Sequence, residues 1–196
     1  MIIEKFFPTL VYGKDVQLDN NKLAQDVINW SNQDKGVSKT NFKGWHSTTD
    51  MHKKPEYSQL VIELMRMQKE IYEHEHIARY ALLGNMWANI NPPGGMNMPH
   101  IHPNSLFSGV YYIKSSSNCG RIKIMDPRPG AQMYMPARKP GNPGKDMWRD
   151  INLDPVEGRI IMFPSWLWHS VEENKSNDIR ISVSFNFIQE GFNGQV

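Results

Sequence analysis

The stretch Met98-Pro99-His100-Ile101-His102-Pro103-Asn104 places two histidines one residue apart, directly after the turn-forming run Pro92-Pro93-Gly94-Gly95. In an extended segment, residues i and i+2 point to the same side, so His100 and His102 can face a single ion. Imidazole binds iron, zinc, copper and nickel alike, and the pair therefore predicts a metal site without naming the metal. A further ligand must come from another part of the chain.

His169 is the best candidate for that further ligand. It follows the run Ile160-Ile161-Met162-Phe163-Pro164-Ser165-Trp166-Leu167-Trp168. The apolar character of this run predicts a largely buried strand with His169 at its end.

A second chemical signal is the segment Arg180-Ile181-Ser182-Val183-Ser184-Phe185-Asn186-Phe187, in which polar and apolar residues alternate strictly. This alternation is typical of a strand with one polar and one apolar face, and Arg180 and Ser182 share the polar face. A guanidinium can bind a carboxylate through two parallel hydrogen bonds, and a nearby hydroxyl can add one more. The pair therefore predicts a binding site for a carboxylate.

In these residues the chain resembles the iron(II)- and 2-oxoglutarate-dependent oxygenases. The resemblance covers about residues 84 to 188 and rests on four motifs in a fixed order. They are His-x-His at 100–102, Ser-Gly-Val-Tyr-Tyr at 108–112, Phe-Pro-Ser-x-Leu-x-His at 163–169 and Arg-x-Ser-x-Ser-x-Asn at 180–186. The resemblance implies a double-stranded β-helix, which is a jelly-roll or cupin-like core, with iron(II) and 2-oxoglutarate as cofactors and O2 as a further substrate.

The resemblance also implies roles for individual residues. His100 takes the place of the first histidine ligand and His169 that of the distal one, while Arg180 and Ser182 take the place of the clamp for the far carboxylate of 2-oxoglutarate. Most of the superfamily has an acidic ligand where this chain has His102.

Because His102 faces the same side as His100 on an extended segment, we predict a site of three histidines. If His102 does not bind, water, Asn104 or Asp126 is left to complete the coordination.

Other residues are candidates for the walls of the site. Tyr111 and Tyr112 fall on opposite faces of one strand, so one can line the cosubstrate pocket while the other packs in the core, and we assign Tyr111 to the pocket. Trp87, Asn89 and Asn91 also share a face that can look into the cavity. In contrast, His46 and His52 lie in a polar, irregular segment and are interpreted as ordinary loop residues.

The composition favours a single cytoplasmic domain. The chain has 196 residues, with 22 basic and 20 acidic residues and a net charge of +2. It is long enough to bury a sizeable core, and it has no basic run of the kind that binds nucleic acid. The single cysteine, Cys119, fits a reducing compartment. The first ten residues do not resemble a signal peptide, and no apolar run approaches the ~18 residues of a membrane span.

The remaining pattern predicts the order of the elements. We expect an opening strand over 6–12, a helix ending by residue 36, a second helix over 56–80, strands over 86–91, 107–113 and 121–125, and a long loop over 126–149 with a short strand near 132–135. Early helices and later short strands predict a β core, about residues 84–188, under an N-terminal strand and helical layer, about residues 1–83. The 126–149 loop is long enough to be a lid or binding loop.

The predicted function is hydroxylation of a peptide, protein or amino-acid side chain by a 2-oxoglutarate-dependent dioxygenase. The substrate rests on analogy with prolyl and aspartyl/asparaginyl hydroxylases. One alternative is a cupin-like metal-dependent enzyme that does not use 2-oxoglutarate, and another is a non-enzymatic jelly-roll binding or structural protein. The oligomeric state is left open, with a homodimer among the alternatives.

Overall fold

The computed structural model describes residues 1–130, 133, 136–141, 144–147 and 149–188. The helices are α1 (Asn20–Gln33) and α2 (Ser58–His74), with 3-10 turns at Met51–Lys53, Pro55–Tyr57 and Lys145–Met147. The strands are β1 (Tyr12–Asp15), β2 (Asn41–Phe42), β3 (Trp45–His46), β4 (Leu82–Asn91), β5 (Met96–His100), β6 (Phe107–Lys114), β7 (Ile122–Met125), β8 (Asp150–Leu153), β9 (Arg159–Pro164), β10 (His169–Val171) and β11 (Arg180–Ile188).

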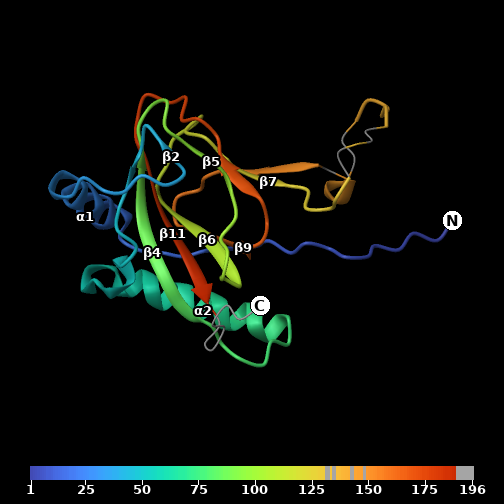
Figure 1. The fold of residues 1–196 in the computed structure, drawn as a ribbon, viewed down its shortest axis with the longest axis horizontal. Coiled ribbons are helices and arrows are strands. Elements are labelled where there is room, and N and C mark those ends of the chain that lie inside the picture. Colours follow the sequence, from blue (N-terminus) through green and yellow to red (C-terminus); the bar gives the residue numbers. More distant parts are fainter. Residues whose placement is uncertain (131–132, 134–135, 142–143, 148, 189–196) are drawn as a thin grey trace.

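The strands form two antiparallel sheets (Figure 1). The larger has the order β1-β9-β6-β11-β4-β3 and the smaller the order β2-β5-β10-β7-β8. Neighbouring strands in each sheet are distant in sequence, as in a jelly roll, and closing two sheets on each other creates an interior that side chains of both can line. The predicted double-stranded β-helix is confirmed.

The alternation in β11 decides which face of the larger sheet is apolar. Ile181, Val183, Phe185 and Phe187 are fully buried in one apolar cluster with residues of α1 and α2. Arg180, Ser182, Ser184 and Asn186 lie on the opposite face, where they line a cavity. The period of two thus directs the apolar half of the strand to the helical layer and the polar half to the interior.

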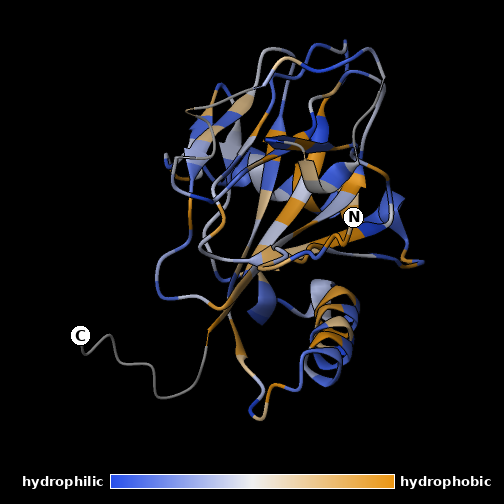
Figure 2. Ribbon diagram, turned by 90° about the vertical axis from the view of Figure 1, so that its right-hand side faces the viewer, coloured by the Kyte–Doolittle hydropathy of each residue, from blue (hydrophilic) through white to orange (hydrophobic). Residues whose placement is uncertain are grey.

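Helix α2 covers this apolar face because one side of it is apolar. Leu60, Leu64, Met67 and Ile71 recur at helical spacing and are almost completely buried. Each such side chain contributes about 1.5 to 3 kcal/mol of transfer free energy. In Figure 2 the helix, at the lower right, carries both hydrophobic and hydrophilic residues, as a helix with one face on a sheet should.

Helix α1 begins where the sequence offers a cap. The Asp19 side chain accepts a hydrogen bond from the backbone N–H of Lys22, which satisfies one of the free donors of the first turn. The helix buries Leu23 and Val27 and ends at Gln33, before Gly36 as predicted.

Several predicted boundaries are wrong. The opening strand is β1 rather than 6–12, since Pro8 has no N–H to donate to a ladder and Phe6 and Phe7 are exposed. Helix α2 spans 58–74 rather than 56–80, and His76 beyond its end has a positive φ of 56°. Strand β8 was not predicted. The predicted short strand at 132–135 lies mostly outside the described residues.

The prediction that His169 ends a buried strand is also wrong. Strand β9 stops at Pro164, and the chain turns, with the N–H of Leu167 donating to the carbonyl of Pro164 at 3.0 Å. His169 then begins β10 in the other sheet. The exposed Trp166 and Trp168 made the turn look like a continuous apolar run in the sequence.

The first 83 residues do not form a separate layer of helices alone. Strands β1 and β3 extend the larger sheet at its two edges, and β2 extends the smaller sheet beside β5. The segment that joins the helices therefore reaches both sheets and supplies part of the cavity wall.

Candidate metal centre and binding cavity

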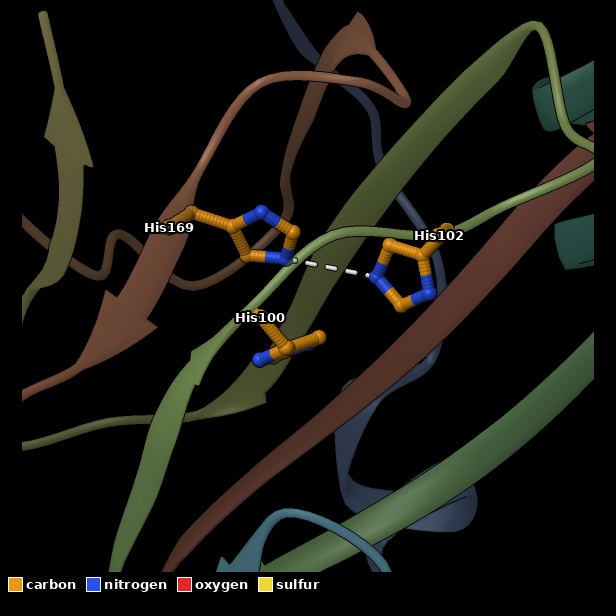
Figure 3. A group of neighbouring side chains, drawn as sticks. All are labelled: His100, His102 and His169. Atoms are coloured by element: carbon orange, nitrogen blue, oxygen red, sulfur yellow. Dashed lines mark hydrogen bonds between the residues drawn. The ribbon is translucent and has the colours of Figure 1, made fainter. Parts of the chain in front are cut away.

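Three histidines, two from neighbouring strands and one from the segment after β5, lie close together (Figure 3). His100 ends β5 and lies directly opposite His169, the first residue of β10, while His102 follows in the turn after β5. The N–H of His102 donates to the carbonyl of Ser165 at 3.0 Å, which holds this turn against the one that precedes β10. One ligand nitrogen from each ring lies within 4.8 Å of the other two.

Backbone carbonyls set the orientation of two of the rings. Nδ1 of His100 lies 2.7 Å from the carbonyl oxygen of Met98, and Nδ1 of His169 lies 2.8 Å from that of Leu167. A carbonyl only accepts, so Nδ1 carries the proton in both rings and the lone pair is on Nε2. This arrangement is the usual one for metal-binding histidines.

The spacing of the nitrogens fits one ion. Nε2 of His102 and Nε2 of His169 are 3.3 Å apart, the pair joined by a dashed line in Figure 3. Two imidazole nitrogens at about 2.1 Å from an ion and at right angles to each other would be separated by about 3 Å. His102 and His169 therefore have the spacing of two ligands of one divalent ion, and His100 supplies a third nitrogen within 4.8 Å of both.

Burial keeps these ligands neutral. Desolvation lowers the pKa of His102 to about 3 and that of His169 to about 4, with repulsion between the histidines adding to both shifts. Desolvation also lowers the pKa of His100. A coordinating ring must be unprotonated, so the fold prepares all three rings for a metal at neutral pH.

The three histidines line a cavity of about 300 Å3 between the sheets. One row of its wall crosses four strands of the larger sheet, with His46 opposite Asn89, Asn89 opposite Ser182, and Ser182 opposite Tyr112. Residues directly opposite in antiparallel strands point to the same face, and all four line the cavity. Arg180 lines the same cavity at one end of β11.

Arg180 is a buried cation, with only 1% of its surface exposed. Its Nη1 donates to the carbonyl oxygens of Cys119 and Gly120 at 2.7 and 2.9 Å. No carboxylate among the described residues pairs with it, and desolvation lowers its pKa. A surface role for Arg180 is excluded, because its charge is enclosed and faces a cavity.

Tyr112 rather than Tyr111 lines the cavity. Tyr111 is completely buried on the helix side of the larger sheet, where its hydroxyl donates to the side chain of Asn20. Tyr112 lies opposite Ser182 and near Arg180, and burial raises its pKa. The prediction that Tyr111 faces the cosubstrate pocket is therefore corrected: the two faces were recognised, but their assignment was reversed.

The predicted substitutes for His102 lie elsewhere. Asn104 is exposed in a turn with φ of 63°. Asp126 is paired with Arg128 and Arg149, and the hydrogen bonds from Arg128 lower its pKa to about 2. Neither belongs to the cluster of possible metal ligands, which contains the three histidines alone among the described residues.

Sequence reasoning missed His46. It is 5% exposed, lines the cavity, and stacks on Trp87 with ring centroids 5.3 Å apart and an interplanar angle of 9°. Trp87 and Asn89 line the cavity as their shared face indicated, whereas Asn91 instead donates to Asn97 at 3.3 Å. The sequence contained no signal for His46, since its two-residue strand is too short to show a periodicity.

The fold and the site together define a double-stranded β-helix protein in which three histidines that could hold a metal ion and a buried arginine line one cavity. Residues 85–186, just over half of the chain, match the family described as "Putative 2OG-Fe(II) oxygenase". The chain belongs to this family. It is an oxidoreductase whose cofactors are iron(II) and 2-oxoglutarate, and the two alternatives from the sequence are not favoured.

Solved structures with the same fold have little sequence in common with this chain. A prolyl-4-hydroxylase from Pseudomonas putida is 13% identical, with a TM-score of 0.65 over 93% of this chain and 94% of that one. A prolyl hydroxylase from Trichoplax adhaerens, in complex with a peptide fragment of the hypoxia inducible factor oxygen degradation domain, is 14% identical, with a TM-score of 0.61 over 92% and 84%. HygX from Streptomyces hygroscopicus, with nickel and 2-oxoglutarate bound, is 9% identical, with a TM-score of 0.65 over 94% and 84%.

A search of curated protein sequences found no match. Within the described part of the chain, neither helix combines the length and the apolar content needed to cross a lipid bilayer.

Proposed function

We propose that this oxygenase holds iron(II) with His100, His102 and His169 and binds 2-oxoglutarate through Arg180, Ser182 and Tyr112. We also propose that it hydroxylates a C–H bond of a peptide, protein or amino-acid side chain. The observation that carries the cosubstrate assignment is the enclosed, unpaired charge of Arg180.

The argument from Arg180 is energetic. A buried charge without a partner costs several kcal/mol, and folded proteins rarely retain one unless it has a counter-ion. The two carbonyls that accept from Nη1 orient the guanidinium but do not neutralise it. A carboxylate in the cavity would supply the missing charge, which fits the far carboxylate of 2-oxoglutarate.

Two hydroxyls add to this clamp. Ser182 and Tyr112 face each other across β11 and β6, and neither hydroxyl is bonded to a described residue. Each can donate to a carboxylate oxygen beside the guanidinium, which is the way buried polar groups are usually satisfied. Tyr112 has a raised pKa and therefore keeps the proton that it must donate.

Bound iron(II) and 2-oxoglutarate supply the oxidative decarboxylation that drives hydroxylation of a C–H bond. The protein's part is positioning. The Nδ1 bonds of His100 and His169 fix two of the rings, and Arg180 would hold one end of the cosubstrate in the cavity that the histidines also line. Val110, Ile122 and Phe163 give part of the cavity wall an apolar surface.

The proposed substrate class has support from the fold only. Two of the similar structures are prolyl hydroxylases, and one of these holds a peptide. At such low identity this likeness supports a peptide or amino-acid side chain as the first class to test.

The test is an anaerobic titration of metal-free protein with iron(II) and then with 2-oxoglutarate. We expect one equivalent of iron and a visible charge-transfer band that appears only with the cosubstrate, followed by succinate formation in air. Iron binding without any 2-oxoglutarate-dependent band would refute the clamp, and failure to bind iron would refute the metal centre.

A further inference from the structure

We infer that His46 and Asn89 form the subsite for the part of the primary substrate nearest the metal, and that this subsite takes an uncharged group with an N–H or O–H donor. An amide N–H is the simplest example. The inference rests on the proposed function, since it names a substrate class for the same site.

His46 presents a hydrogen-bond acceptor to the cavity. Its Nδ1 lies 2.6 Å from the carbonyl oxygen of Ser47, so Nδ1 carries the proton and Nε2 the lone pair. Nε2 makes no hydrogen bond to any residue that the structure describes. The ring is held flat against Trp87, so this acceptor is fixed in place.

Asn89 presents a second acceptor in the same row of the sheet. Its Nδ2 donates to Oγ of Ser184 at 3.1 Å, and its Oδ1 is buried without a partner. Leaving a buried acceptor unpaired is unfavourable, and native proteins usually satisfy such an atom with a ligand, an ion or water. Asn89 lies directly opposite His46, so one bound group can reach both.

This pair lies beside the metal centre. Trp87 stacks on His46 and also contacts His102, with ring centroids 5.8 Å apart. The acceptor pair is thus one aromatic ring away from a metal ligand. Asn89 lies between His46 on β3 and Ser182 of the proposed clamp on β11, so His46 is on the side of Asn89 away from the clamp.

The charges around the cavity decide against a cationic group. Lys39 and Arg180 line it, and no aspartate or glutamate does so among the described residues. The two negative charges of 2-oxoglutarate balance those of a divalent metal, so the loaded site keeps the positive charge of Lys39 and Arg180. An ammonium or amidinium group would lose its hydration without gaining a counter-ion, which is costly in a low-dielectric site. A neutral donor avoids this cost.

The experiment uses the protein loaded with Mn(II) and 2-oxoglutarate and measures the paramagnetic relaxation of small probe molecules by NMR. N-methylacetamide and methyl acetate have the same shape and differ in one N–H donor. Acetamide and acetamidinium likewise match in shape and differ in charge. We expect relaxation of N-methylacetamide to exceed that of methyl acetate by about 2- to 10-fold, the effect of one neutral hydrogen bond. The relaxation of acetamide should likewise exceed that of acetamidinium.

Variants assign the effect to the two residues. His46→Phe keeps an aromatic ring against Trp87 but has no acceptor. The ratio of the relaxation of N-methylacetamide to that of methyl acetate should therefore fall toward 1. His52→Phe is the matched control, because His52 does not line the cavity, and it should keep the preference. Asn89→Asp places a carboxylate in the subsite and should reverse the charge preference, with acetamidinium relaxed more than acetamide.

Failure of the proposed function and failure of this inference give different results. If wild-type protein does not bind Mn(II) and 2-oxoglutarate, the proposed function fails and this inference falls with it. If both bind but methyl acetate is relaxed as strongly as N-methylacetamide, the wall does not present acceptors and this inference alone is wrong. An unchanged preference in both His46→Phe and Asn89→Asp, with metal and 2-oxoglutarate still bound, overturns it equally.

Discussion

His102 is the residue at which this chain departs from the wider superfamily, and its position gives a direct test. Its Nε2 lies 3.3 Å from that of His169, as two ligands of one ion would. We predict that His102→Ala weakens iron(II) binding by about 100-fold or more, beyond the roughly 10- to 100-fold effect of outer-shell residues. His102→Asp should retain the metal, because a carboxylate also binds it.

Isothermal titration of metal-free protein measures both variants, with His52→Ala as a control away from the site. Binding by His102→Ala at the parent affinity would show that His100 and His169 hold the metal without it.

Arg180 is the second residue whose role can be isolated. Lysine keeps the positive charge but loses the planar fork, so Arg180→Lys should weaken 2-oxoglutarate binding by about 1.5 to 3 kcal/mol. The affinity for iron should not change, since Arg180 does not belong to the cluster of three histidines that could hold the metal. The measurement is the charge-transfer band against 2-oxoglutarate concentration. Arg159→Lys is a control, because Arg159 on β9 pairs with Asp15 on the edge strand β1, away from the cavity lining. Equal affinities of the two variants would place the clamp elsewhere.

At the scale of single residues, the sequence predicted site residues that follow the i, i+2 spacing of a strand, and it missed those that follow no such spacing. The i, i+2 spacing brought His100 and His102 to one side, and the alternation in β11 brought Arg180 and Ser182 to one face. The choice between Tyr111 and Tyr112 needed the direction in which β6 faces the helices, which a single strand does not reveal.

At the scale of elements, Gly109 on β6 shows how tightly the larger sheet is packed. A Cβ at this position would lie 2.3 Å from Cζ of Phe185 and 2.5 Å from the carbonyl oxygen of Ile161. The backbone oxygen cannot move away without breaking the sheet, so we predict that Gly109→Ala lowers the free energy of unfolding by about 1 to 3 kcal/mol.

A second glycine provides the control. Gly13 lies on β1 at the other side of β9, opposite Ile161, and a Cβ there meets nothing within 4 Å. Gly13→Ala should leave urea unfolding unchanged or shift it slightly to higher stability. Equal midpoints for the two alanine variants would show that the core around Phe185 adjusts without cost.

The elements themselves differ in how far sequence predicts them. Helix α2 was predicted from the spacing of Leu60, Leu64, Met67 and Ile71 because a long repeat outweighs local exceptions. The break between β9 and β10 was missed, since Trp166 and Trp168 are exposed aromatic residues in a turn and composition does not distinguish them from buried ones. Strands β2 and β3 have two residues each and depend on their partners for their existence.

At the scale of the whole molecule, the cavity between the two sheets encloses the three histidines in surroundings that favour neutral imidazole. This environment makes stability depend on pH. The unfolded chain has histidines with pKa values near 6.5, whereas the folded pKa values are about 3 for His102 and about 4 for His169. Below pH 6.5 the unfolded chain therefore binds more protons than the folded one. Stability from these groups is fully present above pH 6.5 and is lost as the pH falls toward the folded values.

The shifts also move the pH range of metal binding. An exposed histidine would lose its lone pair to a proton near pH 6.5. The lowered pKa values of the folded ligands extend metal binding to more acidic solutions.

The final prediction is that metal-free protein, kept in chelator, becomes less stable between pH 6 and about 4.5 by up to about 1.4 kcal/mol per pH unit for each of His102 and His169. His46 and His100 act in the same direction, because burial lowers their pKa values too. Urea unfolding at several pH values measures the slope, and the window stops above the range in which paired carboxylates titrate. His102→Asn removes one titrating group and should reduce the slope by up to the same amount. A slope that does not change in this variant would mean that His102 is protonated in the folded protein as readily as in the unfolded chain, and that the cavity does not keep it neutral.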